Sequence, residues 1–237
     1  ETLACVMEGT DFVVSALGIT RQSDGLGYRD VDYQANVNLL REAERAGVGR
    51  FAYVHVLNAD AMRQVPLVTA KADFVDVLQR SEIASTVIAP SGYFSDMGEF
   101  LSMARSGRIW LFGTGGTRSN PIHGADLAEA VVDATEAGRS WLNVGGPEAY
   151  TQAEIAQLAF AALGRPARIT RLPDMFRKAA LAVLPWVTPR RIHGPMQFFL
   201  TALARAMVGD PHGSHRLSEH FRNLCAADGH LPKGAIR

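Results

Sequence analysis

Lys71 is a candidate functional residue because of its place in a predicted helix. Residues 66–80 have helical spacing, and Lys71 falls on the same face of that helix as Phe74 and Leu78. This face should pack against a sheet, and burying an ammonium group is unfavourable unless a partner satisfies it. Two interpretations are equally supported by the pattern. Either Lys71 hydrogen-bonds a ligand, or its aliphatic stem is covered while the ammonium group reaches water.

Two apolar runs end in residues that could line a binding site. Residues 11–18 and 50–56 are such runs, and a helical pattern at residues 31–46 joins them. This order predicts neighbouring parallel strands buried on both faces, and ligands of such sheets bind beyond the carboxyl ends of the strands. Small residues there let a flat ring or a ribose approach the backbone. The candidate positions are Ser15, Ala16, Leu17, Gly18, His55, Val56 and Leu57.

A third run, residues 84–90, predicts another parallel strand, so the loop that follows it should lie over the same edge of the sheet. Two aromatic residues in this loop directly follow a glycine. They could form a wall of a ligand site, or they could fill the space under a helix. The candidate residues of this loop are Pro90, Ser91, Gly92, Tyr93 and Phe94.

Other reactive side chains form no recognisable group. His212, His215 and His220 have no carboxylate at ligand spacing, and Cys5 and Cys225 have no metal-binding spacing. The sequence therefore predicts no metal site. With only two cysteines it also indicates a reducing compartment and no disulfide framework.

Alternating strand and helix patterns continue along the chain. Gly47 suits a left-handed helix cap, and Thr151 with Glu154 forms a capping box before another helix. The alternation predicts an α/β fold with a Rossmann-like, doubly wound parallel sheet. Further strands are expected at residues 108–112, 141–144 and 167–172, and further helices at 100–105, 125–137 and 151–164.

The beginning of a dinucleotide-binding fold is not found in the sequence. Such a fold starts with a strand and a glycine-rich turn at a helix N-terminus, but Gly25 and Gly27 follow no strand, and Asp30 stands where the third glycine belongs. Residues 1–7 look like the end of a helix. We therefore expect a first βαβ unit of roughly 30 residues upstream of residue 1.

The composition of the chain changes near residue 173. We expect residues 1–172 to form a partial nucleotide-binding domain and residues 173–237 to form an amphipathic helical appendage, with helices at 175–184 and 196–208. The apolar stripe of this appendage could pack on the chain's own core, which is the default. It could instead cover the cleft, contact a second subunit or another protein, or rest on a membrane surface.

Overall composition narrows the class of protein. The 237 residues include 24 Lys and Arg and 24 Asp and Glu, so no global field favours nucleic acid or an anionic membrane. No apolar run approaches the length of a membrane span, and no signal peptide is recognisable. We expect a cytoplasmic protein with a small-molecule substrate; the oligomeric state stays open.

Taken in order, several motifs resemble the atypical short-chain dehydrogenase/reductase superfamily. The closest resemblance is to its NmrA-like group, which includes divinyl chlorophyllide reductase-like proteins, and it covers about residues 1–210. The matching stretches are residues 15–18, 32–40, 46–51, 70–71, 90–97, 111–113, 121–128 and 144–147.

The resemblance implies an NAD(P)H cofactor that lies across residues 15–18 and under residues 90–94. In the usual active site of the superfamily, a tyrosine four residues before a lysine is the general acid, and the lysine holds the nicotinamide ribose. Lys71 matches that lysine, but Leu67 stands at the tyrosine position. His55 falls where a serine is expected, and Asp32 where an asparagine is expected. The choice between NADH and NADPH stays open.

These departures lead to two hypotheses. Leucine cannot donate a proton, so reduction of a carbonyl by the usual route is not expected, whereas reduction of an activated alkene or quinone-like substrate needs a hydride and a proton from water or another side chain. The first hypothesis is such an atypical oxidoreductase, with catalytic Lys71 and with Tyr93 or His55 near the substrate. The second is a non-catalytic NAD(P)-binding regulatory or complex-associated subunit.

Overall fold

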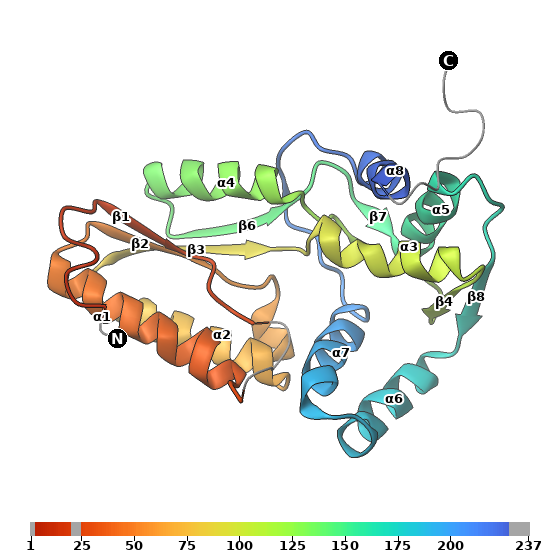
Figure 1. Ribbon diagram of the computed structural model, residues 1–237, viewed down its shortest axis with the longest axis horizontal. Helices are drawn as coiled ribbons and strands as arrows, with labels where there is room; N and C mark the ends of the chain where they lie inside the picture. The colour runs from red at the N-terminus through yellow and green to blue at the C-terminus, as the bar shows by residue number, and fades with distance from the viewer. Residues whose placement is uncertain (1–2, 20–24, 228–237) are drawn as a thin grey trace.

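The computed structural model describes residues 3–19 and 25–227, apart from the side chains of Arg190 and Arg191 (Figure 1). Its centre is a five-stranded sheet with the order β1-β2-β3-β6-β9, in which all neighbours are parallel. This arrangement confirms the predicted α/β fold with a parallel sheet. The strands are β1 (Phe12–Ser15), β2 (Arg50–Val54), β3 (Ala84–Pro90), β6 (Trp141–Gly145) and β9 (Asp210–Pro211).

Helices cover both faces of this sheet. Helices α1 (Asn36–Ala46) and α2 (Pro66–Leu78) lie on one face, and α4 (Gly124–Glu136) lies on the other (Figure 1). Strand β2 shows why its sequence is nearly continuous in apolar residues. Phe51 and Tyr53 pack in the α1–α2 cluster, while Ala52 and Val54 pack in the α4 cluster.

A second group of elements packs beside the end of the sheet. Helices α3 (Gly98–Arg105), α5 (Gln152–Ala162) and α8 (Leu217–Ala227) share one apolar cluster, which includes Phe100, Phe160 and Phe221. Residues 167–172 were expected to form a last edge strand. They instead contain β8 (Ile169–Leu172), which pairs with β4 (Ile109–Phe112) in a separate two-stranded parallel sheet. The remaining short pair, β5 (Arg118–Ser119) and β7 (Tyr150–Thr151), is antiparallel.

Local signals for helix ends are confirmed. Gly47 caps α1 with a φ of 68°, and Thr151 and Glu154 form both halves of a capping box at α5. The expected helix end at residues 1–7 is wrong for its described part, because Cys5 and Gly9 have positive φ and residues 4–9 form turns. Two 3₁₀ segments, η2 (Ala59–Met62) and η3 (Phe94–Met97), lie near the carboxyl ends of the strands.

The C-terminal region differs from the expected pair of helices. Helix α6 (Asp174–Val187) is longer than predicted, and α7 (Arg190–Ala202) begins after Pro189 and carries Pro195 inside it. The sequence placed the second helix after Pro195 and extended it to residue 208. Residues beyond Ala202 instead lead to β9, and the unanticipated α8 packs on α5, so this region contributes to both groups of elements.

Candidate functional site

Lys71 lies on α2 with its ammonium group directed toward η1 (Arg29–Ala35) and the carboxyl end of β1. Its Nζ is 3.2 Å from Oδ1 of Asp32 and 3.4 Å from the hydroxyl oxygen of Tyr53. The Lys71 side chain is 12% exposed, and that of Asp32 is fully buried. The ammonium group is therefore held inside the fold by Asp32, which argues against the interpretation in which it reaches water; its hydrogen bond to a ligand stays a prediction.

Two opposing electrostatic effects act on the pKa values of Lys71 and Asp32. Burial raises the pKa of Asp32 and lowers the pKa of Lys71, because each charge is removed from water. The attraction between the two groups opposes both shifts, and the amide of Ile19 donates a hydrogen bond to Oδ2 of Asp32 at 3.2 Å. Oδ1 faces the ammonium group without a directed hydrogen bond among the described residues.

The backbone at the end of β1 lies directly against this ion pair. A Cβ atom placed on Gly18 would lie 2.5 Å from Oδ1 of Asp32 and 2.9 Å from Nζ of Lys71. Only glycine fits at this distance. Ala16, Leu17 and Gly18 are all exposed, so the backbone of this segment is open to a ligand beside the charged pair.

Asn36 is a buried residue of this region that the sequence analysis did not single out. Its Oδ1 accepts a hydrogen bond from the Ser15 hydroxyl at 2.6 Å. Its Nδ2 donates to the carbonyl oxygens of Leu17, Val31 and Asp32 at 3.3, 3.2 and 3.0 Å. Asn36 thus joins β1 to the π-helical segment η1, which carries Asp32. The available signal was a second polar residue four positions after Asp32, beside the apolar stripe of the helix.

His55 lies at the end of β2, in a different environment from Lys71. Its ring is buried, its Nδ1 has no hydrogen-bond partner among the described residues, and burial lowers its pKa to about 4. The ring contacts Trp141 edge to face, with centroids 6.1 Å apart. His55 and Trp141 line a hollow of about 490 Å³ beside α2, whose other lining residues are Leu57, Asn58, Ala59, Asp60, Ala61, Arg63, Ala72, Val75, Asp76, Gln79 and Asn143.

The residues of the loop after β3 lie in different environments. The Ser91 hydroxyl donates to the carbonyl oxygen of Asn120, and Gly92 has a φ of 140°, which favours glycine. Tyr93 is partly buried on the α4 side, and burial, with a smaller effect of Asp96, raises its pKa to about 12. Phe94 is buried in the α3–α5–α8 cluster, so it fills space under helices, which was the second interpretation of this aromatic pair.

The carbonyl oxygen of Pro90 connects this loop to β2, because it accepts a hydrogen bond from the Leu57 amide at 3.1 Å. This bond brings Pro90 to the same edge of the sheet as His55. The structure therefore groups Ser15, Leu17, Gly18 and Lys71 at the end of β1, and His55 and Pro90 further along the edge. The ligand-binding roles of all these residues stay predictions.

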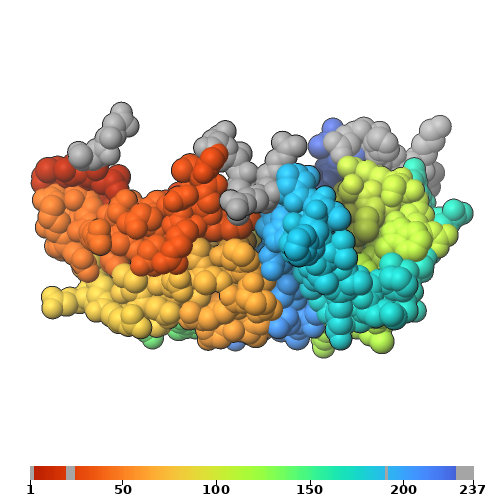
Figure 2. Space-filling view, turned by 90° about the horizontal axis from the view of Figure 1, so that it is seen from below, coloured from red at the N-terminus to blue at the C-terminus, as the bar shows by residue number. Residues whose placement is uncertain are grey.

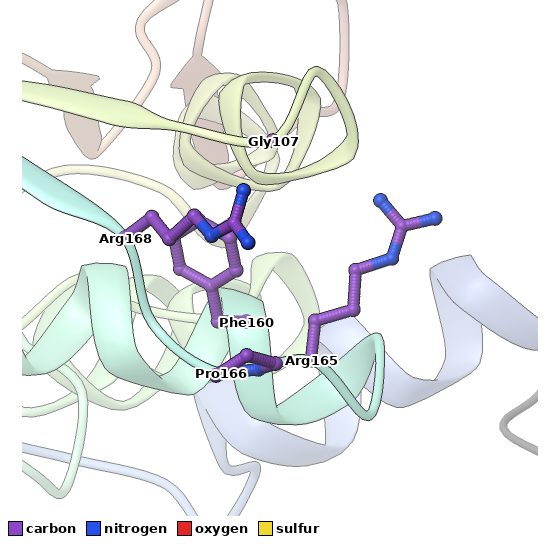
Figure 3. Close-up of a pocket in the computed structure, with 5 residues that line it drawn as sticks. All are labelled: Gly107, Phe160, Arg165, Pro166 and Arg168. Carbon is purple, nitrogen blue, oxygen red and sulfur yellow. The ribbon is translucent and has the colours of Figure 1, made fainter.

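A second hollow, of about 280 Å³, contains none of the residues singled out in the sequence. It is lined by Gly107, Phe160, Arg165, Pro166 and Arg168, at the base of α3 and α5. Figure 3 shows the Arg165 side chain directed away from Phe160. This hollow belongs to the second group of elements, with α3 and α5, whereas Lys71 lies on α2 beside the central sheet.

The C-terminal histidines contact a carboxylate that is distant in sequence. Nδ1 of His215 lies 2.6 Å from Oδ1 of Asp126, and the His215 ring stacks on His123 with centroids 4.0 Å apart. His123 caps α4 by accepting a hydrogen bond from the Ala125 amide. Within the described residues, no group of three or more His, Cys, Asp or Glu side chains is placed to hold a metal ion.

Comparison with solved structures supports the fold. An NADPH-dependent quinone oxidoreductase of Escherichia coli, solved with NADPH, aligns with a TM-score of 0.69 at 18% identity, over 92% of this chain and 77% of that chain. At this identity the similarity shows a shared Rossmann-like fold.

Comparison with curated proteins identifies relatives by sequence. The photosystem II assembly factor Ycf39 of Synechocystis is 28% identical over 73% of this chain and 54% of its own length. Divinyl chlorophyllide a 8-vinyl-reductase of Oryza sativa is 29% identical over 68% of this chain and 43% of its own length. The chain thus spans about half the length of these relatives.

The family match covers the part of the chain that forms β1 to α4. The NAD(P)H-binding family matches residues 1–137, which include Gly18, Asp32, Lys71 and the loop after β3. The parallel sheet agrees with this match. The chain is therefore a member of the NAD(P)H-binding family, with the motifs of its atypical short-chain dehydrogenase/reductase group.

Proposed function

We propose that this protein is an NAD(P)H-dependent oxidoreductase that reduces an activated alkene or a quinone-like substrate. The observation that carries the proposal is the position of Lys71, whose ammonium group is buried beside the exposed backbone of Gly18. The names of two similar proteins, a quinone oxidoreductase and a vinyl reductase, support the same class of substrate.

The residues at the end of β1 fit a nicotinamide ribose. The exposed backbone of residues 16–18 offers close approach. Oδ1 of Asp32, 3.2 Å from the Lys71 ammonium group, is a buried acceptor that receives no directed hydrogen bond from the part of the chain that the structure describes. Lys71 would donate to a ribose hydroxyl, and Asp32 would hold the ammonium group in place. Asn36 and Ser15 would fix the shape of the segment. A bound reduced nicotinamide supplies the hydride for the reduction.

Proton delivery by the usual tyrosine is not available to this chain. Leu67 stands at that position and is buried in an apolar cluster with Leu57 and Val68. His55 is neutral near pH 7 because its pKa is about 4, so it is a weak general acid there. An activated alkene or a quinone suits such a site, because hydride addition can precede protonation by water or by the phenol of Tyr93.

The alternative function is an NAD(P)-binding subunit without catalysis. Two observations favour it: the usual general acid is replaced by Leu67, and a similar protein is named as an assembly factor. Both functions require the nucleotide site at the end of β1. They differ in whether bound reduced cofactor is oxidised when an acceptor is added.

The test uses the whole natural protein, including any sequence beyond these 237 residues. Titration with NADH and NADPH measures binding, and loss of cofactor absorbance with quinone, enone and tetrapyrrole acceptors measures turnover. We expect Lys71→Ala to lower turnover at least about tenfold, since that is the ordinary scale for losing one transition-state contact. Lys178→Ala, which changes an exposed lysine on α6, is the matched control.

Two results would contradict the proposed oxidoreductase. Unchanged turnover in Lys71→Ala would show that this lysine has no role in turnover. Tight cofactor binding with no oxidation by any of the acceptors would select the non-catalytic function instead.

A further inference from the structure

Helices α6 and α7 carry large apolar side chains that face solvent. Trp186 is 88% exposed, the highest value among the exposed large apolar residues, and Val183 is 51% exposed. Isolated exposed apolar residues are common, but a concentration of such residues on the two adjacent helices α6 and α7 marks an interaction surface. We call this group the α6–α7 apolar surface; its members are Met175, Phe176, Val183, Trp186, Val187, Ile192 and Met196.

The opposite side of α6 is fixed to the protein. Leu184 and Arg177 are buried, and the Arg177 guanidinium donates to the carbonyl oxygen of Leu200 in α7 at 3.2 Å. The same guanidinium is paired with Asp174 at 2.6 Å. The default expectation that this region packs on its own core therefore holds for only one side of α6. The large apolar side chains on the other side of α6 are exposed to solvent.

The shape of the molecule presents this surface outward. The turn between α6 and α7 lies at the bottom of Figure 1, away from the central sheet. Figure 2 views the molecule from that side and shows both helices at the surface. A planar partner approaching from this side would meet α6 and α7 at the surface (Figure 2).

Charge along this segment is mainly positive. Residues 174–209, from the first residue of α6 to the residue before β9, contain one acidic residue, Asp174, and five Lys or Arg residues, although the whole chain has equal numbers of acidic and basic residues. Lys178 lies next to the apolar surface and is 73% exposed. The basic residues of the segment are Arg177, Lys178, Arg190, Arg191 and Arg205. The neutral global charge therefore conceals a locally cationic region.

We propose that the α6–α7 apolar surface binds an anionic lipid bilayer, with α6 and α7 lying in the headgroup region. Apolar and aromatic side chains next to Lys and Arg are the composition of helices that bind at this interface, and Trp is favoured there because its ring is apolar while its N–H stays hydrated. Anionic headgroups complement the net positive charge of the segment. A second copy of this chain would bring two cationic regions together, so a self-association surface is disfavoured.

This binding does not require a helix that crosses the membrane. Within the described residues, no helix is long and apolar enough to span a bilayer. The association would be peripheral and reversible, and it would bring the nucleotide site close to substrates dissolved in the lipid. It does not depend on the proposed oxidoreductase activity.

Flotation of the whole protein with vesicles tests the proposal. Vesicles of phosphatidylglycerol and phosphatidylcholine are expected to carry the protein upward, whereas vesicles of phosphatidylcholine alone are expected to bind about tenfold less. Val183→Glu should reduce flotation at least about tenfold, because it places a carboxylate in the apolar surface. The matched control is Val132→Glu on α4, where the exposure is 50% against 51% for Val183. Unfolding of each variant is monitored by circular dichroism.

A spectroscopic measurement locates the contact independently. With Trp110, Trp141 and any tryptophan outside these 237 residues replaced by Phe, the remaining fluorescence comes from Trp186 and should shift to shorter wavelength when anionic vesicles are added. Absence of flotation, equal loss in Val183→Glu and Val132→Glu, equal binding to neutral vesicles, or an unshifted Trp186 spectrum would each overturn the proposal. Concentration-dependent dimerisation that Val183→Glu abolishes, without vesicle binding, would assign the surface to a second copy instead.

Discussion

The ammonium nitrogen of Lys71 lies 3.2 Å from Oδ1 of Asp32 inside the protein, 39 positions away along the sequence. Removal from water disfavours the charged form of each group, and their attraction restores it. Such a pair holds the ammonium group at a fixed place, at the end of β1.

Removing only Lys71 should be more damaging to stability than removing the pair. Lys71→Met leaves the Asp32 carboxylate buried without its partner, which typically costs about 3–5 kcal/mol of unfolding free energy. The double variant Lys71→Met with Asp32→Asn should recover much of that loss, since no uncompensated charge remains. Denaturant unfolding of both single variants and the double variant gives the coupling energy. A coupling energy near zero would show that the two groups do not act as a pair.

Gly18→Ala should weaken nucleotide binding through the same pair. The added Cβ would overlap Oδ1 of Asp32 and Nζ of Lys71, so the ion pair must separate or the β1 segment must move. We expect the dissociation constant for NAD(P)H to rise about tenfold, which corresponds to about 1.4 kcal/mol. Gly98→Ala is the control, because a Cβ there meets no atom within 4 Å. Equal affinities in the two variants would place the nucleotide elsewhere.

Burial of neutral His55 should make stability depend on pH. The folded-state pKa is about 4, below the ordinary value of 6.5, so the unfolded chain binds more protons between these values. His55 therefore favours the folded state fully above about pH 6.5, and this contribution is lost as the pH falls toward 4. The loss should approach roughly 3 kcal/mol, since one pKa unit corresponds to about 1.4 kcal/mol.

The measurement for His55 is unfolding free energy against pH in the natural protein and in His55→Leu. The variant should show a smaller slope between pH 6.5 and 4, while the other histidines contribute equally to both proteins. Parallel curves would mean that His55 reaches solvent and titrates normally.

Much of the fold could be derived from local patterns. Continuous apolar runs at residues 50–56 and 84–90 predicted strands buried on both faces, and Gly47 and Thr151 marked the helix boundaries correctly. These features depend on side-chain spacing and backbone preference within a few residues. The prediction of the second C-terminal helix failed because Pro195 was treated as a helix break, whereas α7 contains Pro195. The prediction for residues 167–172 failed because the alternation of strands and helices does not say which strand β8 pairs with.

The sequence by itself determined that Lys71 shares a helix face with core residues and that small residues end the first strand. Only the tertiary structure decided that Asp32 is the partner of Lys71, that Asn36 ties η1 to β1, and that Phe94 turns into another cluster. The physical reason is that helix periodicity fixes the direction of a side chain relative to its own neighbours. Which distant atoms satisfy a buried charge depends on how the helices and strands pack, and that information is spread over the whole chain.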